Sequence, residues 1–332
     1  MKILVTGGKG FIGSNFILQC LEQQKNTKII NLDNLTIGSN STNLSNLKNP
    51  NYSFIKGNIC NKKLVSKLIR DVDVVVNFAA ESHVDRSIKN SDMFIKSNFL
   101  GVHNILENIR LRKNVKLLHI STDEVYGEVN KGKSKENDVL NPSNPYSATK
   151  ASAEMLIQSY IRTYDLDVII SRASNNFGPR QYPEKLIPKT ILHALNNKPI
   201  PIHGTGESIR QWIYVDDNCE ALLKILSNWK KSYLIFNIGG NNMYSNLVVV
   251  KKILKIMKKP ESLIIHTEDR PGQDKRYAID SRLILKEINF KSKTDFDKGL
   301  KFTVNWYLKN TNWWKNIPLK KASNPTPWIA KS

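Results

Sequence analysis

A glycine-rich turn directly behind the first apolar segment constrains the fold of this chain more than any other feature. Residues 2–6 form a short apolar run, and the turn that follows places glycines at Gly7, Gly10 and Gly13. This spacing permits a tight turn, close approach of a pyrophosphate, and a helix whose N-terminal N–H groups bind phosphate. The next apolar run ends at Asp33, about 20 residues beyond the last glycine. A carboxylate there favours the ribose hydroxyls of NAD over the 2′-phosphate of NADP, so the sequence predicts an NAD site.

Apolar runs and helical patterns alternate through the first half of the chain. Continuous aliphatic runs are typical of parallel strands covered on both faces, and they occur at 2–6, 28–32, 73–78, 115–121 and 167–171. Helical periodicity lies between them, most clearly at 11–24 and 146–164. The alternation predicts an α/β fold: a Rossmann-type doubly wound parallel sheet with a smaller C-terminal α/β lobe that binds substrate.

The expected domain boundaries lie where this alternation loosens and prolines become frequent, after residue 174. We assign 1–174 to the NAD-binding domain and expect 212–238 to return to it. The substrate-binding lobe is then built from 175–211 and 239–320, with a tail at 321–332.

A Tyr-x-x-x-Lys pair opens the helical segment after Pro145. Tyr146 and Lys150 are four residues apart, which places both side chains on one helix face. An ammonium beside a phenol stabilises the phenolate, lowers the tyrosine pKa and makes it a usable base near neutral pH. This spacing is common by chance, and it gains weight from the NAD motif that precedes it.

Two adjacent carboxylates, Asp123 and Glu124, follow Thr122 at the end of the apolar run 115–121. Ligands of parallel sheets bind at the carboxyl ends of the strands. Paired acids at a buried strand end are costly unless they are used or solvated. Together with the Tyr/Lys pair, they predict an acid–base site.

The composition limits the classes of partner that this chain is expected to bind. Lys+Arg 50 against Asp+Glu 29 gives a net charge of +21. The basic residues are spread along the chain and match no nucleic-acid-binding motif, so we expect no nucleic-acid partner. No apolar run approaches the roughly 20 residues that span a bilayer, so we expect no membrane partner and no signal peptide. Three scattered cysteines show no metal or redox spacing, which predicts a reducing compartment, the cytoplasm, and no metal site.

Taken together, these segments resemble the nucleotide-sugar 4,6-dehydratases of the extended short-chain dehydrogenase/reductase family. The resemblance covers nearly the whole chain. It rests on TGGKGFIGSN (6–15), NFAAESHVDRSI (77–88), STDEVYGE (121–128), PYSATKASAE (145–154), SNNFGPRQYPEKLIPK (174–189), PIHGTGESIRQWIYVDD (201–217), FNIGG (236–240), RPGQDKRYAID (270–280) and TVNWYLKN (303–310). Related epimerases and decarboxylases share the glycine turn and the Tyr/Lys pair but lack the Asp-Glu pair after Thr122.

The resemblance implies a reaction in three stages. Tyr146, aided by Lys150 and Thr122, takes the proton of the sugar 4-hydroxyl while NAD accepts hydride from C4. The 4-ketone acidifies the C5 proton, which Glu124 removes, and Asp123 protonates the departing 6-hydroxyl. Hydride returns to C6, which gives a 4-keto-6-deoxy sugar nucleotide. Neighbouring acids suit this division of labour because two adjacent negative charges raise one pKa.

The resemblance also implies two sets of binding residues. Those expected at the cofactor are Gly7, Gly10, Phe11, Ile12, Gly13, Asp33, Asn34, Asn58, Ile59, Ala79, Ala80, Ser82, Ser97, Tyr146, Lys150 and Asn176. Those expected at the sugar nucleotide are Ser82, Thr122, Asn175, Lys185, His203, Arg210, Asn237, Arg270 and Tyr277. Asn58 stands where the family commonly has Asp; it keeps a carbonyl acceptor for the adenine amino group.

The remaining expectations concern the substrate and the assembly. Some segments look like plant UDP-rhamnose synthases and others like bacterial dTDP-glucose enzymes. They favour UDP-glucose slightly over dTDP-glucose, with UDP-GlcNAc behind both, in a rhamnose-type deoxysugar route. A 4-epimerase and a non-catalytic NAD or sugar-nucleotide-binding regulator are the alternatives. By resemblance, we expect a homodimer joined through helices near 91–112 and 146–164.

Overall fold

A seven-stranded sheet forms the larger part of the molecule. The computed structural model describes residues 1–112, 114–231, 235–315 and 317. The strand order is β10-β6-β5-β4-β1-β2-β3, and every neighbouring pair is parallel. The strands are β1 (Lys2–Thr6), β2 (Lys28–Asp33), β3 (Tyr52–Lys56), β4 (Val74–Asn77), β5 (Lys116–Thr122), β6 (Val168–Ala173) and β10 (Ile235–Ile238). This topology confirms the predicted doubly wound α/β fold.

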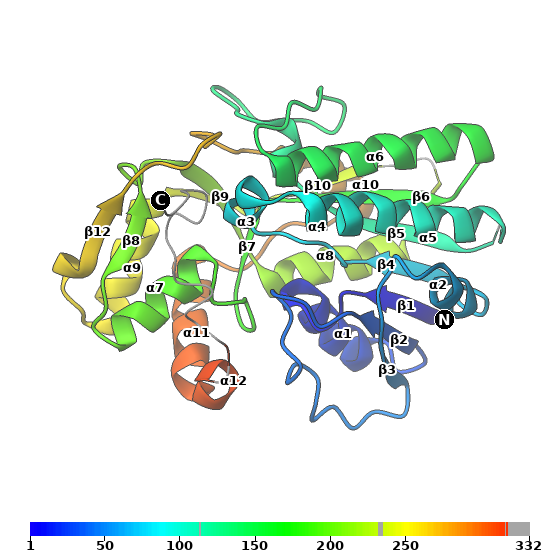
Figure 1. Cartoon of the computed structure of the whole chain (residues 1–332), viewed down its shortest axis with the longest axis horizontal. Helices are drawn as coiled ribbons and strands as arrows, with labels where there is room; N and C mark the ends of the chain where they lie inside the picture. The colour runs from blue at the N-terminus through cyan, green and yellow to red at the C-terminus, as the bar shows by residue number, and fades with distance from the viewer. Residues whose placement is uncertain (113, 232–234, 316, 318–332) are drawn as a thin grey trace.

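Helices cover both faces of this sheet (Figure 1). One face packs against α1 (Phe11–Gln23) and α8 (Val215–Ser227). The other packs against α2 (Lys62–Ile69), α5 (Gly101–Arg110) and α6 (Pro145–Tyr164). The apolar strands β1, β4 and β5 are almost completely buried between these layers, as their continuous apolar runs require.

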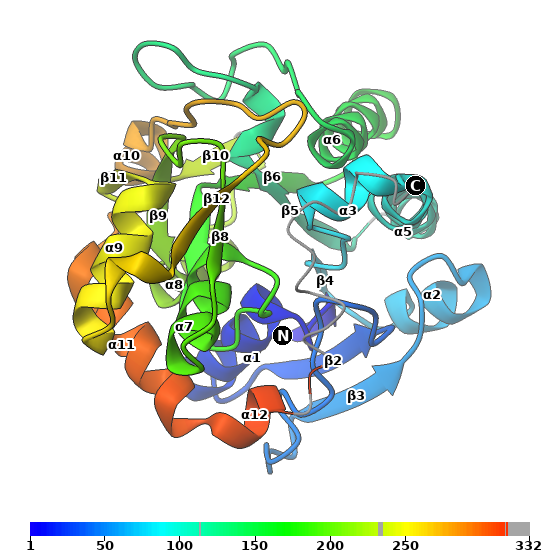
Figure 2. The same cartoon turned by 60° about the vertical axis from the view of Figure 1, so that its left-hand side comes forward.

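The smaller lobe lies beyond the carboxyl ends of these strands (Figure 2). It contains a three-stranded and a two-stranded sheet with helices packed against them. Its strands are β7 (Asn175–Phe177), β9 (Ile209–Tyr214) and β11 (Asn242–Ser245), and β8 (Ile200–His203) and β12 (Ile264–Thr267). Its helices are α7 (Leu186–Leu195), α9 (Asn246–Met257), α11 (Phe296–Lys309) and α12 (Thr311–Lys315), with a single turn at Glu261–Leu263. Helix α10 (Arg282–Ile288) crosses back to pack beside β10.

Two local features differ from the sequence-based expectation. Strand β3 was not predicted, because it is an edge strand without a buried residue and carries no continuous apolar run. The helical segment near 91–112 is not one α-helix: α3 (Val84–Lys89) and α4 (Asp92–Phe94) precede a π-helical stretch at Ile95–Leu100 before α5. The expected tail at 321–332 lies outside the described residues, as do positions 232–234 of the stretch 212–238 that was expected to return to the NAD-binding domain.

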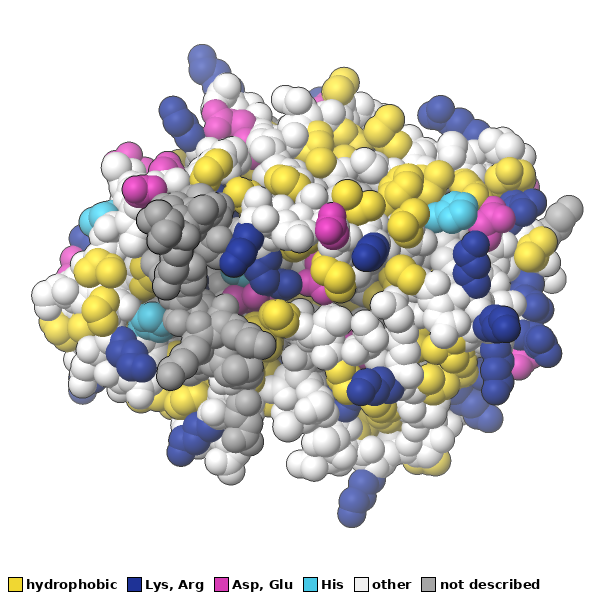
Figure 3. Space-filling view, viewed as in Figure 1, with side chains coloured by type: hydrophobic (Ala, Val, Ile, Leu, Met, Phe, Trp, Pro, Cys, Tyr) yellow, Lys and Arg dark blue, Asp and Glu magenta, His cyan; other side chains and the backbone are white. Residues whose placement is uncertain are grey.

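The basic side chains are distributed over the surface. Figure 3 shows Lys and Arg scattered across one face, with more of them at the edge over α2. In the described part of the chain, no helix is long and apolar enough to cross a membrane.

Candidate active site

Two adjoining cavities lie at the carboxyl ends of the strands. The first, of about 210 Å³, runs along the glycine turn and the ends of β2 and β4. The second, of about 170 Å³, lies against the smaller lobe, and Glu184 and Lys185 line both. The first cavity is lined by the residues expected at the cofactor, with one exception: Gly7, Gly10, Phe11, Ile12, Gly13, Asp33, Asn34, Asn58, Ile59, Ala79, Ala80, Ser82, Ser97, Tyr146 and Lys150. The exception, Asn176, lines the second cavity.

The glycine turn has the shape that a dinucleotide requires. Gly7 has φ +73°, and a Cβ there would lie 2.6 Å from the backbone nitrogen of Ala79. A Cβ on Gly13 would lie 2.6 Å from the Gly7 carbonyl oxygen. Helix α1 begins behind this turn without a side-chain cap, so its first N–H groups are left for an anion. The residues present therefore fit NAD.

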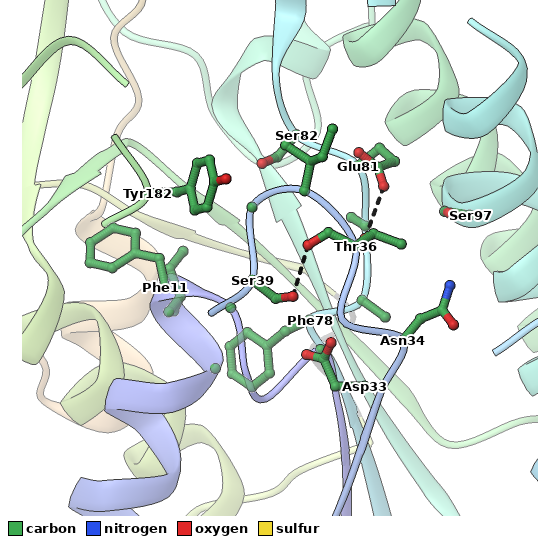
Figure 4. A pocket seen from close by; sticks show the side chains of 18 of the residues that line it. Phe11, Asp33, Asn34, Thr36, Ser39, Phe78, Glu81, Ser82, Ser97 and Tyr182 are labelled. Carbon is green, nitrogen blue, oxygen red and sulfur yellow. Dashed lines mark hydrogen bonds between the residues drawn. The ribbon is translucent and has the colours of Figure 1, made fainter. Parts of the chain in front are cut away.

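Asp33 stands at the end of β2 with its carboxylate fixed in place (Figure 4). Its Oδ2 accepts a hydrogen bond from the Lys9 backbone N–H at 2.8 Å, and its Oδ1 accepts one from Leu35 at 2.7 Å. Burial raises the pKa of Asp33, whereas these hydrogen bonds and the Lys9 charge lower it. The carboxylate is thus positioned at the cavity wall, as the ribose contact requires.

The loop behind Asp33 covers the same cavity. The Thr36 hydroxyl donates to Glu81 Oε1 at 3.2 Å (Figure 4). Arg86 pairs with Glu81 at 2.7 Å and with Glu184 at 3.2 Å. The sequence reasoning missed Thr36, Glu81 and Glu184, because these distant residues meet only in the folded chain.

Asn58 lines the first cavity, and its adenine contact stays a prediction. Its Oδ1 accepts a hydrogen bond from the Cys60 N–H at 2.8 Å. A carbonyl oxygen accepts two hydrogen bonds, so one position remains for the adenine amino group.

Helix α6 presents Tyr146 and Lys150 because of how it begins. Asn144 caps the helix, Ser147 completes a capping box, and Pro145 occupies the first turn. Tyr146 therefore lies in the first turn, beside the end of β5.

Tyr146 and Lys150 are buried, but they do not pair as predicted. The Lys150 ammonium donates to the Ile120 carbonyl oxygen at 2.6 Å and lies 3.3 Å from His119 Nε2. Burial lowers the pKa of Lys150 to about 8. The pKa of Tyr146 is raised, first by burial and then by the charge of Glu124, while a hydrogen bond with Thr122 lowers it. The predicted lowering by Lys150 is therefore wrong for this arrangement, because the ammonium is directed at the β5 backbone.

The Asp-Glu pair lies on a single 3₁₀ turn, η2 (Asp123–Tyr126), directly after β5. Thr122 caps this turn by accepting a hydrogen bond from the Glu124 N–H at 3.3 Å. Asp123 Oδ2 and Glu124 Oε2 are buried and have no hydrogen-bond partner among the described residues. Burial, followed by the charge of Glu124, raises the pKa of Asp123 to about 8. Asp123 is therefore protonated near neutral pH.

The second cavity gathers most of the residues expected at the sugar nucleotide: Asn175, Lys185, His203, Arg210, Arg270 and Tyr277. The Arg210 guanidinium lies 4.3 Å from the centre of the Tyr277 ring. It donates to the backbone carbonyls of Ile209 and Asp274 at 2.9 Å. The cavity is therefore cationic, as a diphosphate requires.

Asp85 is a further charged residue of this cavity that the sequence reasoning missed. It lies 3.1 Å from Arg270 Nη1 and 3.7 Å from His203 Nε2. Although burial raises it, the pKa of Asp85 is held below its ordinary range by His203, His83 and Arg270. Asp85 thus holds two of the predicted substrate residues in place.

Three predicted substrate residues lie elsewhere. Asn237 is fully buried, and its amide bonds the Tyr126 hydroxyl at 2.8 Å and the Ser134 carbonyl at 3.0 Å, so the structure gives it a structural role instead. Thr122 lies beside Tyr146 rather than in the second cavity wall. Ser82 lines the first cavity, and its carbonyl accepts a hydrogen bond from Lys185. In the described ranges, no three His, Cys, Asp or Glu side chains come together as metal ligands.

Comparison with known proteins identifies the family. The family model described as GDP-mannose 4,6 dehydratase matches residues 4–303. The chain is a member of the NAD-dependent nucleotide-sugar 4,6-dehydratases of the extended short-chain dehydrogenase/reductase family. The dTDP-glucose 4,6-dehydratase of Salmonella typhimurium is 40% identical over 100% of this chain and 99% of that protein. The low-salt glycan biosynthesis protein Agl12 of Haloferax volcanii is 46% identical over 93% of this chain and 99% of that protein.

Solved structures of dehydratases superpose over most of the chain. The dTDP-glucose 4,6-dehydratase of Bacillus anthracis, in complex with NAD, has a TM-score of 0.87 and 43% identity. The enzyme of Streptomyces venezuelae, solved with NAD bound, has a TM-score of 0.92 and 37% identity. Each match covers 95% of this chain and 99% of the other. The predicted family and the predicted cofactor, NAD, are confirmed.

Replacing Gly7 with Ala should weaken NAD binding by this dehydratase. The new Cβ would meet Ala79 in the cavity wall and force the end of β1 away from the loop after β4. Gly132→Ala is the matched control, since Gly132 also has φ +73° but no atom lies within 4 Å of its added Cβ. Calorimetric titration with NAD should show loss of affinity for Gly7→Ala alone. Equal affinity in both variants would contradict the fit of NAD to this turn.

Proposed function

We propose that this dehydratase converts dTDP-glucose to dTDP-4-keto-6-deoxyglucose. The observation that carries the proposal is the buried Asp123-Glu124 pair, in which Asp123 holds a proton near neutral pH beside Tyr146. Elimination of water requires one group to remove a proton and another to donate one. The raised pKa of Asp123 favours its protonated form as the donor, and we assign Glu124 beside it as the base.

We assign the oxidation at C4 to Tyr146, Thr122 and Lys150. NAD⁺, when bound, supplies the hydride acceptor for C4 and, once reduced, the hydride donor for C6. Tyr146 accepts the proton of the 4-hydroxyl, and the Thr122 hydroxyl stabilises its phenolate. Lys150 donates from its ammonium to the Ile120 carbonyl and so holds α6, which carries Tyr146, against β5.

We assign the elimination of water to Asp123 and Glu124. Glu124 removes the proton at C5, which the 4-ketone has made acidic. Asp123 donates its proton to the 6-hydroxyl as it leaves as water. The dry surroundings of both carboxyls strengthen these interactions relative to bulk water.

The cationic residues of the second cavity are assigned to the sugar nucleotide. Lys185, Arg210 and Arg270 face the diphosphate, for which Arg supplies a planar pair of donors. Asn175, His203 and Tyr277 complete the wall around the nucleoside and the sugar. Asn176 joins this cavity rather than the cofactor cavity.

The names of the relatives support the proposal of dTDP-glucose rather than UDP-glucose as the substrate. Dehydratases named for dTDP-glucose are 39–41% identical across nearly the whole chain, and this outweighs the short segments that favoured UDP-glucose. The product belongs to a deoxysugar route, and the name of the relative Agl12 supports use in a glycan. Three free thiols, Cys20, Cys60 and Cys219, suit a cytoplasmic location.

The choice of substrate is tested by following the product with NMR. Purified protein is incubated with dTDP-glucose and, in parallel, with UDP-glucose. We expect a 4-keto-6-deoxy product at the higher rate from dTDP-glucose. A higher rate from UDP-glucose would overturn the nucleotide assignment, and no such product from either would overturn the proposal.

A 4-epimerase is the second candidate function. The UDP-glucuronic acid 4-epimerase of Bacillus cereus has a TM-score of 0.88 at 29% identity, which shows that this fold also supports epimerisation. The Asp123-Glu124 pair favours the dehydratase, because epimerisation eliminates no water. A 4-epimer without water loss would favour the epimerase, and binding without turnover would favour a regulator.

Replacing Glu124 with Gln should separate oxidation from elimination. Tyr146 and Thr122 remain for the first step, but no base remains for the C5 proton. NADH absorbance should therefore accumulate while the elimination rate falls by about 10²-fold or more. Glu128→Gln, an exposed Glu four residues further on, serves as the control and should turn over normally. Turnover of Glu124→Gln at the normal rate would remove Glu124 from its role.

The elimination step should slow as the pH rises through about 8, because Asp123 then loses the proton that it donates. Rapid-mixing measurements of water loss and of NADH formation separate this effect from the titration of Lys150, which acts on oxidation. In Asp123→Asn, the elimination activity that remains should no longer decrease as the pH rises through about 8, a decrease that we call the alkaline limb. An unchanged limb in that variant would assign the titration to another group.

We also propose a homodimer formed through α4, the π-helical stretch and α6. Large apolar side chains are exposed there, including Met93, Ile95, Leu100 and Met155, and Figure 3 shows apolar side chains gathered over this region. Such patches mark interaction sites. Met155→Glu should shift sedimentation from dimer to monomer, whereas Val139→Glu, at an exposed loop position, should not. A monomeric unmodified protein would contradict the proposal.

A further inference from the structure

The helix face that carries Tyr146 and Lys150 continues to a third ionisable residue, Glu154, four residues further along α6. Glu154 is fully buried. Its Oε1 accepts a hydrogen bond from Ser121, and its Oε2 accepts bonds from Arg172 Nε at 2.9 Å and Nη2 at 2.6 Å. Glu154 thus joins α6 to neighbouring positions of β5 and β6, since Ser121 and Arg172 are partners in the sheet.

Arg172 extends this network to the catalytic turn. Its Nη1 donates to the Tyr126 hydroxyl at 2.6 Å and to the Glu136 carbonyl at 3.0 Å. The guanidinium also lies 4.6 Å from the centre of the Tyr126 ring. Tyr126 in turn donates its hydroxyl proton to Asn237 Oδ1 at 2.8 Å. The hydrogen bonds that connect Glu154, Arg172, Tyr126 and Asn237 are all buried.

Tyr126 is the last residue of the 3₁₀ turn that carries Asp123 and Glu124. A helix of four residues has too few internal hydrogen bonds to fix its own orientation. Thr122 fixes the start of the turn, and Val125 packs in a small apolar cluster with Ala151 of α6. The Tyr126 hydroxyl is the polar anchor at the other end.

We propose that Tyr126 is a positioning residue, through which the Glu154–Arg172 pair holds Asp123 and Glu124 in register with Tyr146 on α6. This inference rests on the proposed dehydratase function. Burial of a charge pair is costly unless its hydrogen bonds are satisfied, and here both carboxylate oxygens and all three guanidinium nitrogens have hydrogen-bond partners. One rigid network therefore connects the helix that carries the C4 base to the turn that carries the elimination pair.

Tyr126→Phe tests this role, because it removes one hydroxyl and keeps the packed ring. Oxidation is measured from NADH absorbance, and elimination from the 4-keto-6-deoxy product. We expect elimination to slow by tenfold to about a hundredfold, since a misplacement of about 1 Å can cost about 10²-fold. NADH should accumulate, the KM for the sugar nucleotide should stay unchanged, and the alkaline limb of elimination should shift.

Tyr160→Phe is the matched control on the same helix as Glu154, because its hydroxyl also bonds a carboxylate, Glu107 Oε1 at 2.7 Å, away from the cavities. It should leave both steps unchanged. If Tyr126→Phe slows oxidation and elimination equally, or slows neither, the inference is overturned.

Arg172→Lys provides a second route should Tyr126→Phe fold poorly. The ammonium keeps the charge opposite Glu154 but lacks the second arm that reaches Tyr126. We expect the same selective loss of elimination, and an equal loss of both steps would overturn the inference. Failure of the unmodified protein to dehydrate either nucleotide would instead overturn the proposed function, and the positioning role with it.

Discussion

The contact between the Lys150 ammonium and the Ile120 carbonyl is the interaction on which the site depends most. It joins α6, which carries Tyr146, to β5, whose next residues are Ser121, Thr122 and Asp123. Both partners are buried, so the ammonium cannot exchange this acceptor for water. Tyr146 and the Asp123-Glu124 pair are therefore brought together by one helix–strand contact, even though they lie more than 20 residues apart in the chain.

Burial also affects the chemistry of the acidic residues that this contact brings close to Tyr146. Asp123 is buried, Glu124 is half-buried, and one carboxyl oxygen of each is buried without a hydrogen-bond partner among the described residues. Desolvation disfavours charge, so burial raises the pKa of Asp123 and favours its protonated form. Glu124 also lines the second cavity beside Lys185 and Arg210, and the Arg210 charge lowers the pKa of Asp123 less than burial raises it. The fold thus affects the chemistry by burying the 3₁₀ turn that carries Asp123 and Glu124.

The features that local sequence determines were predictable, and those set by long-range contacts were not. The glycine turn, the buried strands and the start of α6 follow from backbone geometry, capping and apolar periodicity. The Asp85 contacts with Arg270 and His203, and the contacts among Thr36, Glu81 and Glu184, depend on side chains that meet only after folding. The Tyr146–Lys150 spacing predicted a shared face but not the direction of the ammonium, because the Ile120 carbonyl competes for it. Asn237 was misassigned for a similar reason: its buried partners, Tyr126 and Ser134, are more than 100 residues away.

The central claim is that one active site oxidises C4, eliminates water across C5 and C6, and reduces C6. Its most direct test is the fate of a deuterium label placed at C4 of dTDP-glucose. The account predicts that mass spectrometry and NMR of the product will find the deuterium at C6 of a 4-keto-6-deoxy sugar. Deuterium retained at C4 of a 4-epimer, or lost to solvent, would contradict it.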